Sequence, residues 1–175
     1  PHFHAFGLTA GALLPLLNGM QSVIGLSPLR HKESLQLLRT HKPTVMLSTD
    51  TFLHQLHRVA QPEDFASLRF VVAGAERLKS RTRELYEALG VTMLEGYGAT
   101  EASPVIAVNV PGATRHGTVG RLLPHIEYRI EPHDGIEEGG VLHVRGPNLM
   151  KSYLHDLLED RSSLDDGWYD TGDIV

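Results

Sequence analysis

The feature that most constrains this chain is an alternation of short β-branched runs with helically spaced leucines in its N-terminal half. Pro43 and Gly90 are placed to end two of the helices. Strands that alternate with helices of this length favour a parallel sheet covered on both faces. The patterns predict strands over Ser22–Ser27, Thr44–Leu47, Leu68–Ala73 and Val91–Leu94, and helices over Lys32–Thr40, Phe52–Val59 and Arg81–Leu89.

The pattern changes after about Gly117. Short strands are predicted over Ile126–Ile130 and Val141–Val144, with turn residues around His133 to Gly135 between them. This C-terminal part reads as antiparallel and barrel-like. We therefore predict an α/β protein with a flavodoxin-like parallel-sheet subdomain over residues 1–118 and part of a β-barrel subdomain over residues 119–175.

Composition excludes several classes of function. The net charge of −5 over 175 residues gives no reason to expect nucleic acid or an anionic membrane surface as a general partner. Cysteine is absent, which excludes disulfides, cysteine–zinc sites and a thiol nucleophile and fits a cytosolic protein. No apolar run reaches the roughly 18 residues of a membrane span. The 11 histidines lack a compact ligand set with carboxylates, so we expect no metal–histidine site.

The first candidate site is the run EGYGATEASP, which begins at Glu95 directly after a predicted buried strand. Ligands of open α/β sheets bind at the carboxyl ends of strands. The glycines on either side of Tyr97 let the backbone approach a ligand closely. Thr100 and Glu101 suit a phosphate oxygen and the magnesium ion on it. A glycine-rich turn with a Thr-Glu pair at a helix start is an equal alternative.

Three further segments are weaker candidates. Asp173, in the run WYDTGD, is suited to accept hydrogen bonds from both hydroxyls of a ribose, although such a run also occurs in ordinary turns. The run Ala73–Glu76 closes a strand where backbone groups can meet a purine edge, and a plain strand–helix turn is the equal alternative. For the run Arg145–Tyr153 a structural duty is the preferred interpretation.

Taken together and in this order, the segments resemble the adenylate-forming superfamily of acyl and aryl ligases, luciferase and peptide-synthetase adenylation domains. The resemblance rests on four motifs: PHFHAFG at Pro1, GYGATE at Gly96, the run from Gly139 to Tyr153, and WYDTGD at Trp168. A narrower resemblance rests on the runs VVAGAERL, LEGYGATEASPV, GTVGRLLP and GWYDTGDIV. It is to the synthetase half of bacterial bifunctional 2-acylglycerophosphoethanolamine acyltransferase/acyl-acyl-carrier-protein synthetases.

The resemblance implies an activity. The protein would adenylate a long-chain fatty acid with ATP and Mg²⁺ and transfer the acyl group to the phosphopantetheine thiol of acyl carrier protein, for reacylation of a lysophospholipid. A fatty acyl-coenzyme A ligase shares all of these motifs and is the first alternative. A non-catalytic nucleotide- or acyl-binding module is the alternative from another class.

The resemblance also implies roles for single residues. Tyr97 would stack on adenine, Thr100 would bind the α-phosphate, Glu101 would hold Mg²⁺, Asp173 would bind the ribose hydroxyls, and His4 would lie at the mouth through which the acyl chain or pyrophosphate passes. Thr100, Glu101 and His4 are the implied catalytic residues. The implied nucleotide-binding residues are Gly74, Ala75, Glu76, Glu95, Gly96, Tyr97, Gly98, Thr100 and Asp173.

The chain also departs from the family pattern. Ser152 replaces the usual glycine before Tyr153. The loop that holds the β- and γ-phosphates is expected before Pro1, and the small domain with the catalytic lysine after Val175. We therefore expect the isolated 175-residue chain to be inactive. The full-length protein is expected in the cytoplasm, at the inner face of the inner membrane where segments outside this chain attach it.

Overall fold

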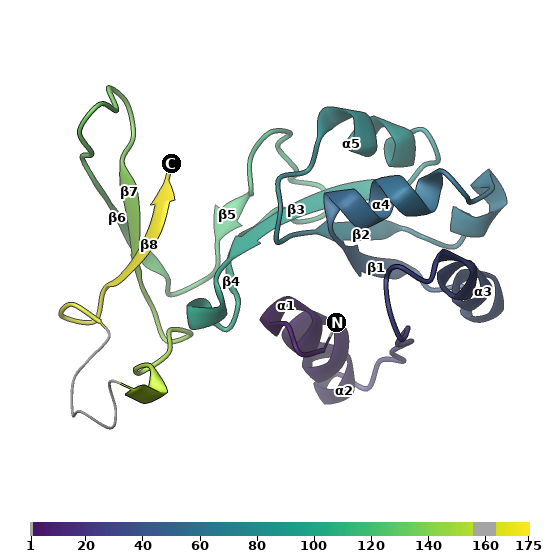
Figure 1. Ribbon diagram of the computed structural model, residues 1–175, viewed down its shortest axis with the longest axis horizontal. Coiled ribbons are helices and arrows are strands. Elements are labelled where there is room, and N and C mark those ends of the chain that lie inside the picture. The colour runs from purple at the N-terminus through teal and green to yellow at the C-terminus, as the bar shows by residue number, and fades with distance from the viewer. Residues whose placement is uncertain (1, 156–163) are drawn as a thin grey trace.

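The computed structural model describes residues 2–155 and 164–175, in which two sheets follow one another along the chain (Figure 1). Pro1 of the first motif lies outside the described residues. The first sheet, in the order of its strands, contains β1 (Val45–Ser48), β2 (Phe70–Ala73), β3 (Thr92–Gly98), β4 (Val105–Val108) and β5 (Arg121–Leu122). The second contains β6 (Glu127–Glu131), β7 (Val141–Arg145) and β8 (Tyr169–Ile174).

The helices lie mostly before and between the strands of the first sheet. None of those in the described ranges is long and apolar enough to cross a membrane. They are α1 (Ala5–Leu8), the π-helical η1 (Thr9–Leu13), α2 (Leu14–Leu17), α3 (His31–His41), α4 (Asp50–His57), the 3₁₀ turn η2 (Pro62–Phe65), α5 (Ser80–Glu87) and the 3₁₀ turn η3 (Thr100–Ala102).

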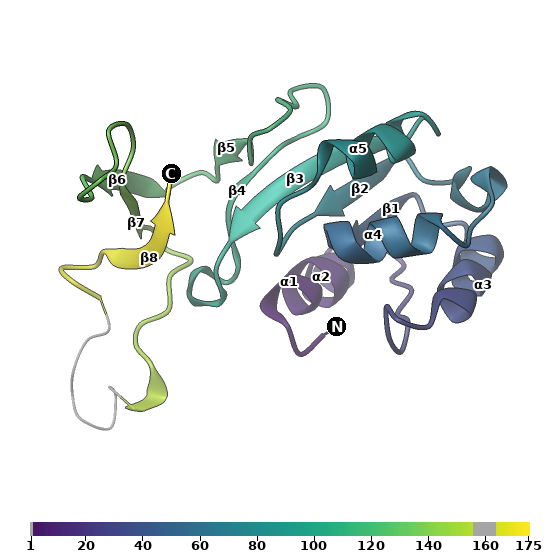
Figure 2. The ribbon, with the colours of Figure 1, turned by 45° about the horizontal axis from the view of Figure 1, so that its top comes forward.

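The strands β1, β2 and β3 run parallel, which confirms the predicted fold class. In Figures 1 and 2, α4 and α5 lie on one side of this sheet and α1 and α2 on the other. The boundaries of the helices follow the expected signals. α3 ends because Lys42 adopts a left-handed φ of 45° and Pro43 follows. Gly90, with φ of 77°, turns the chain just beyond α5.

A core of buried apolar side chains joins the helices α3, α4 and α5 to the parallel strands. Tyr86 is fully buried in this core, and its hydroxyl donates a hydrogen bond of 3.0 Å to the carbonyl oxygen of Leu53. The hydroxyl therefore has a partner inside the apolar core. The core contains Leu35, Leu38, Leu53, Leu56, Phe65, Leu68, Val71, Ala73, Leu78, Tyr86, Val91 and Met93.

The predicted strand Ser22–Ser27 is wrong. The structure has no strand over this run, and β1 forms the edge of the sheet. Ile24 and Leu26 remain 55% and 79% exposed, although apolar residues at these positions suggested a buried strand. An apolar run becomes a strand only where a neighbouring strand supplies hydrogen bonds, and the described residues supply none here.

Antiparallel pairing begins earlier than the sequence suggested. β3 pairs parallel with β2 but antiparallel with β4, and β4 pairs antiparallel with β5, so the change falls within the first sheet and before Gly117. The second sheet is antiparallel throughout, as predicted, and Gly135 turns the chain between β6 and β7 with φ of 83°. The division at residues 118 and 119 stays a prediction.

A buried ion pair fixes α5 to β3. The guanidinium of Arg83 donates to the carboxylate of Glu95 and, at 3.1 Å, to the carbonyl oxygen of Met93. The side chains of Arg83 and Glu95 are only 8% and 9% exposed. Because a buried charge without a partner is costly, this pair holds the strand that leads into the candidate site.

We expect Arg83→Met to lower the free energy of unfolding by about 3–5 kcal/mol, because it leaves the Glu95 carboxylate buried without its partner. The double variant Arg83→Met/Glu95→Gln should lose clearly less than the single variant. Arg81→Met on the exposed side of α5 is the matched control and should change little. Urea unfolding of the four proteins measures these differences. A double variant as unstable as the single one would contradict this account.

Candidate functional site

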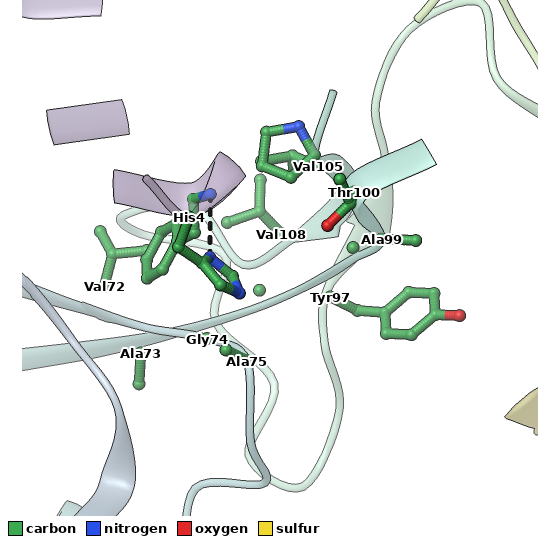
Figure 3. A pocket seen from close by; sticks show the side chains of 14 residues that line it. His4, Val72, Ala73, Gly74, Ala75, Tyr97, Ala99, Thr100, Val105 and Val108 are labelled. Carbon is green, nitrogen blue, oxygen red and sulfur yellow. Dashed lines mark hydrogen bonds between the residues drawn. The ribbon is translucent and has the colours of Figure 1, made fainter. Parts of the chain in front are cut away.

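The carboxyl ends of β2 and β3 meet the N-terminal segment at a pocket of about 290 Å³ (Figure 3). β2 leads into Gly74 and Ala75, and β3 ends at Gly98. The volume is close to the lower end of the roughly 300–1,000 Å³ typical of small-molecule sites. Four apolar side chains form much of its wall: Phe6, Val72, Val105 and Val108. The pocket therefore suits an apolar group next to a polar rim.

His4 lies on the wall of this pocket (Figure 3). Its Nδ1 accepts a hydrogen bond of 3.2 Å from the backbone N–H of Phe6, which caps the first turn of α1. This bond fixes the imidazole against the helix start. A Cβ at Gly74 would lie 3.5 Å from the Phe6 ring, so the ring packs directly on this glycine. The role of His4 in passage of a ligand stays a prediction.

Gly98 sets the shape of the turn that follows β3. A Cβ at this position would lie 2.0 Å from the carbonyl oxygen of Pro104, so no side chain fits. The same oxygen accepts a hydrogen bond of 2.9 Å from the N–H of Ala99. The chain thus returns tightly on itself around η3. Thr100 lines the pocket at this turn, and Figure 3 shows its side chain beside Ala99 and Val105.

Tyr97 and Asp173, which are far apart in the sequence, are hydrogen-bonded to one another. The Tyr97 hydroxyl donates to the Asp173 carboxylate, and Figure 3 shows the ring directed away from His4. Burial, together with the hydrogen bond to this carboxylate, raises the pKa of Tyr97 to about 12. The tyrosine is therefore a neutral donor at ordinary pH. The structure brings together the two residues expected to contact adenine and ribose.

Glu101 directly follows Thr100, which lines the pocket. Its own backbone N–H, followed by the hydroxyl of Tyr153 at 2.8 Å, holds the pKa of this carboxyl below its usual value. Within the described ranges, no group of three His, Cys, Asp or Glu residues could hold a metal ion. Mg²⁺, however, is usually bound by one or two carboxylates and the phosphates of a substrate. A single ionised Glu101 with unused lone pairs fits that ion.

Two other predicted nucleotide-binding residues have their carboxylates bonded within the fold. Glu76 accepts hydrogen bonds from the N–H and the hydroxyl of Thr51, at 2.7 and 2.9 Å, at the start of α4. Glu95 is buried in its ion pair with Arg83. Of the predicted adenine-edge residues, Gly74 and Ala75 line the pocket. Nucleotide contacts of Glu76 and Glu95 stay a prediction.

The turn η3 is held by residues that follow β7, and the sequence alone did not predict these contacts. Asn148 donates hydrogen bonds of 2.7 and 3.1 Å to the carbonyl oxygens of Ala102 and Val105. The N–H of Met150 donates to the carbonyl oxygen of Glu101 at 2.7 Å. These residues belong to the run Arg145–Tyr153, for which a structural duty was the preferred interpretation. The family motif that ends at Tyr153 was the only feature of the sequence that pointed to these residues.

Comparison with known proteins places this site in context. The sequence profile of a family described as AMP-binding enzyme matches residues 1–154. A long-chain-fatty-acid–CoA ligase of Haemophilus influenzae is 31% identical over 183 residues, which cover 100% of this chain and 33% of the relative. The p-hydroxybenzoic acid–AMP ligase FadD22 of Mycobacterium tuberculosis is 33% identical over 179 residues, which cover 99% of this chain and 25% of the relative.

The fold is also similar to that of solved ligase structures. A benzoate CoA ligase from Burkholderia xenovorans superposes with a TM-score of 0.85 at 25% identity, over 99% of this chain and 37% of that one. An o-succinylbenzoate coenzyme A synthetase from Bacillus subtilis, in complex with ATP and magnesium ion, gives a TM-score of 0.76 at 28% identity, over 99% and 37%. The chain thus spans about a quarter to two fifths of the length of these proteins.

The close approach at Gly98 yields a direct test. We expect Gly98→Ala to lower the free energy of unfolding by about 3 kcal/mol or more, at or beyond the upper end for overpacked sites, because the Cβ would overlap a backbone oxygen. Gly96→Ala is the matched control, since a Cβ there would lie no closer than 3.4 Å to the Val108 side chain. It should change stability by less than about 1 kcal/mol. Urea unfolding measures both, and equal losses would disprove the constraint.

Proposed function

Because the chain belongs to the AMP-binding enzyme family, the adenylate-forming acyl and aryl ligases, we propose that the full-length protein activates a long-chain fatty acid with ATP and Mg²⁺. The activated acyl group would then pass to the thiol of acyl carrier protein. The fatty-acid substrate is supported by the relatives named as long-chain-fatty-acid–CoA ligases. ATP and magnesium are supported by the complex of the o-succinylbenzoate relative.

One observation carries this proposal. An apolar pocket lies directly beside Thr100, and Glu101 is the next residue, so an acyl chain in the pocket would bring its carboxylate to a phosphate-binding rim. Tyr97 and Asp173 lie together, where an adenine ring and a ribose would be needed. A protein that binds only an apolar ligand would not need these polar and charged residues beside its pocket.

The proposed reaction joins two anions. A carboxylate oxygen of the acid attacks the α-phosphorus of ATP, the new O–P bond gives an acyl adenylate, and the bond to pyrophosphate breaks. The Thr100 hydroxyl would donate to an α-phosphate oxygen as its charge grows. Glu101 would hold Mg²⁺, which lowers the repulsion between the carboxylate and the phosphates. The attacking oxygen comes from the substrate, so the chemistry needs no side-chain nucleophile.

The thiol acceptor is proposed mainly from the narrower sequence resemblance. In support, Arg77 and Arg81 are exposed near the start of α5, where an acidic carrier protein could contact them. The other two cations of this stretch are already paired within the fold. Lys79 forms an ion pair of 3.4 Å with Asp50, and Arg83 is buried against Glu95. Reacylation of a lysophospholipid, through an acyltransferase part outside this chain, is the use that the resemblance suggests.

Coenzyme A is the second candidate acceptor, because relatives from several bacteria are named as CoA ligases. A non-catalytic nucleotide- or acyl-binding module is a third interpretation. It is disfavoured because Thr100 lines the pocket, Glu101 follows it directly, and Asp173 accepts a hydrogen bond from Tyr97 of the pocket wall. We also propose a cytoplasmic location, at the inner membrane where other segments of the protein attach it.

A single experiment separates the acceptors. The full-length protein is incubated with ATP, Mg²⁺ and a long-chain fatty acid, with either holo-acyl carrier protein or coenzyme A, and the thioester is identified by mass spectrometry. Acyl-acyl-carrier-protein as the main product supports the proposal. Acyl-coenzyme A alone supports the second candidate. Absence of both thioesters and of acyl adenylate favours the non-catalytic module.

We expect Asp173→Ala in the full-length protein to raise the KM for ATP at least tenfold. Two hydrogen bonds from ribose hydroxyls to this carboxylate would each contribute on the order of 1.5–3 kcal/mol. The KM for the fatty acid should change much less. Asp134→Ala, in the exposed turn after β6, is the matched control. Steady-state kinetics and thermal unfolding of both variants check this, and an unchanged KM for ATP would remove Asp173 from the site.

A further inference from the structure

Glu101 belongs to an element too short to hold a long side chain in place. η3 comprises Thr100–Ala102, a single 3₁₀ turn, and the chain leaves it through Ser103 in a left-handed conformation with φ of 58°. A glutamate side chain has three rotatable bonds, and a single turn restricts them little. If Glu101 holds Mg²⁺ in one geometry, groups outside η3 must hold its carboxylate.

The structure shows one such group from the other end of the chain. The hydroxyl of Tyr153 donates a hydrogen bond of 2.8 Å to Oε1 of Glu101. The N–H of Met150, three residues earlier, donates to the carbonyl oxygen of the same glutamate at 2.7 Å. The segment after β7 therefore holds Glu101 by its backbone and by its carboxylate at once.

Tyr169, the first residue of β8, stabilises the same region by packing. It pairs with Val144 of β7, which is fully buried, and it packs on a small apolar core that also contains Ala102 of η3. The turn that carries Glu101 is therefore packed against the second sheet.

The chemistry of the partners indicates function rather than stability. The Tyr153 hydroxyl and the backbone N–H of Glu101 are both neutral donors, so the carboxylate keeps its full negative charge. Among the residues that the structure describes, no arginine, lysine or histidine forms a salt bridge with Glu101. A carboxylate offers about four lone-pair positions, so these two donors leave room for a cation. Glu95, by contrast, has its charge neutralised by Arg83.

We propose that Tyr153 is a positioning residue that orients the Glu101 carboxylate for Mg²⁺. This inference rests on the proposed function, because it takes Glu101 as the metal-binding carboxylate. It gives a role to the tyrosine of the run Arg145–Tyr153. It also makes metal binding depend on contact between the two sheets.

The test uses the full-length protein with a non-hydrolysable ATP analogue and measures Mn²⁺ binding by electron paramagnetic resonance. Tyr153→Phe keeps the ring and removes the hydroxyl, and it should weaken Mn²⁺ binding by about tenfold, the lower end for groups that orient a metal ligand. The Mg²⁺ concentration for half-maximal pyrophosphate exchange should rise in parallel. Turnover at saturating Mg²⁺ should stay close to wild type.

Two further variants make the result decisive. Tyr128→Phe, at an exposed position of β6, is the matched control and should leave Mn²⁺ binding unchanged. Glu101→Gln shows whether the metal is bound where we propose. If Glu101→Gln binds Mn²⁺ like wild type, the metal role of Glu101 and this inference both fall. If Tyr153→Phe alone binds like wild type, the positioning role is wrong and the proposed function stands. A lower melting temperature of Tyr153→Phe with unchanged Mn²⁺ binding would likewise overturn the positioning role.

Discussion

The rest of the site depends on β3, which has a parallel neighbour on one side and an antiparallel neighbour on the other. Its first half pairs parallel with β2, and its last three residues pair antiparallel with β4, with a register shift between Tyr97 and Gly98. The close approach of Gly98 to Pro104 permits this return. As a result the pocket, the turn η3 and the Tyr97 ring all lie at the end of one strand, which Arg83 holds from α5 through Glu95.

The carboxylates of this protein differ in the partners that they have. Several pair with cations, as Asp64 does with Arg39 at 2.6 Å, and these pairs fix elements to each other. Glu101 and Asp173 instead accept hydrogen bonds from tyrosine hydroxyls. A neutral donor orients a carboxylate without cancelling its charge. This difference marks the two acidic residues available for a cation and for sugar hydroxyls.

The sequence predicted those parts of the fold that depend on local signals. The helices α3, α4 and α5 follow from leucine spacing and from stop signals such as Pro43 and Gly90. The strand predicted at Ser22–Ser27 failed because a strand also needs a neighbour, which no local pattern reveals. Motifs identified several residues that line the pocket, because each motif is continuous in the sequence. The bond from Tyr153 to Glu101 could not be predicted in this way, because it joins residues that only the folded chain brings together.

We propose that this site forms part of an enzyme that adenylates a fatty acid. The most direct measurement is ATP–pyrophosphate exchange by the full-length protein, with a panel of long-chain fatty acids, benzoate and related aryl acids, and no thiol acceptor. We predict that labelled pyrophosphate enters ATP only when a fatty acid and Mg²⁺ are both present. Exchange with aryl acids alone would contradict the proposed substrate. No exchange with any acid, by a folded protein that still binds ATP, would contradict the enzymatic function itself.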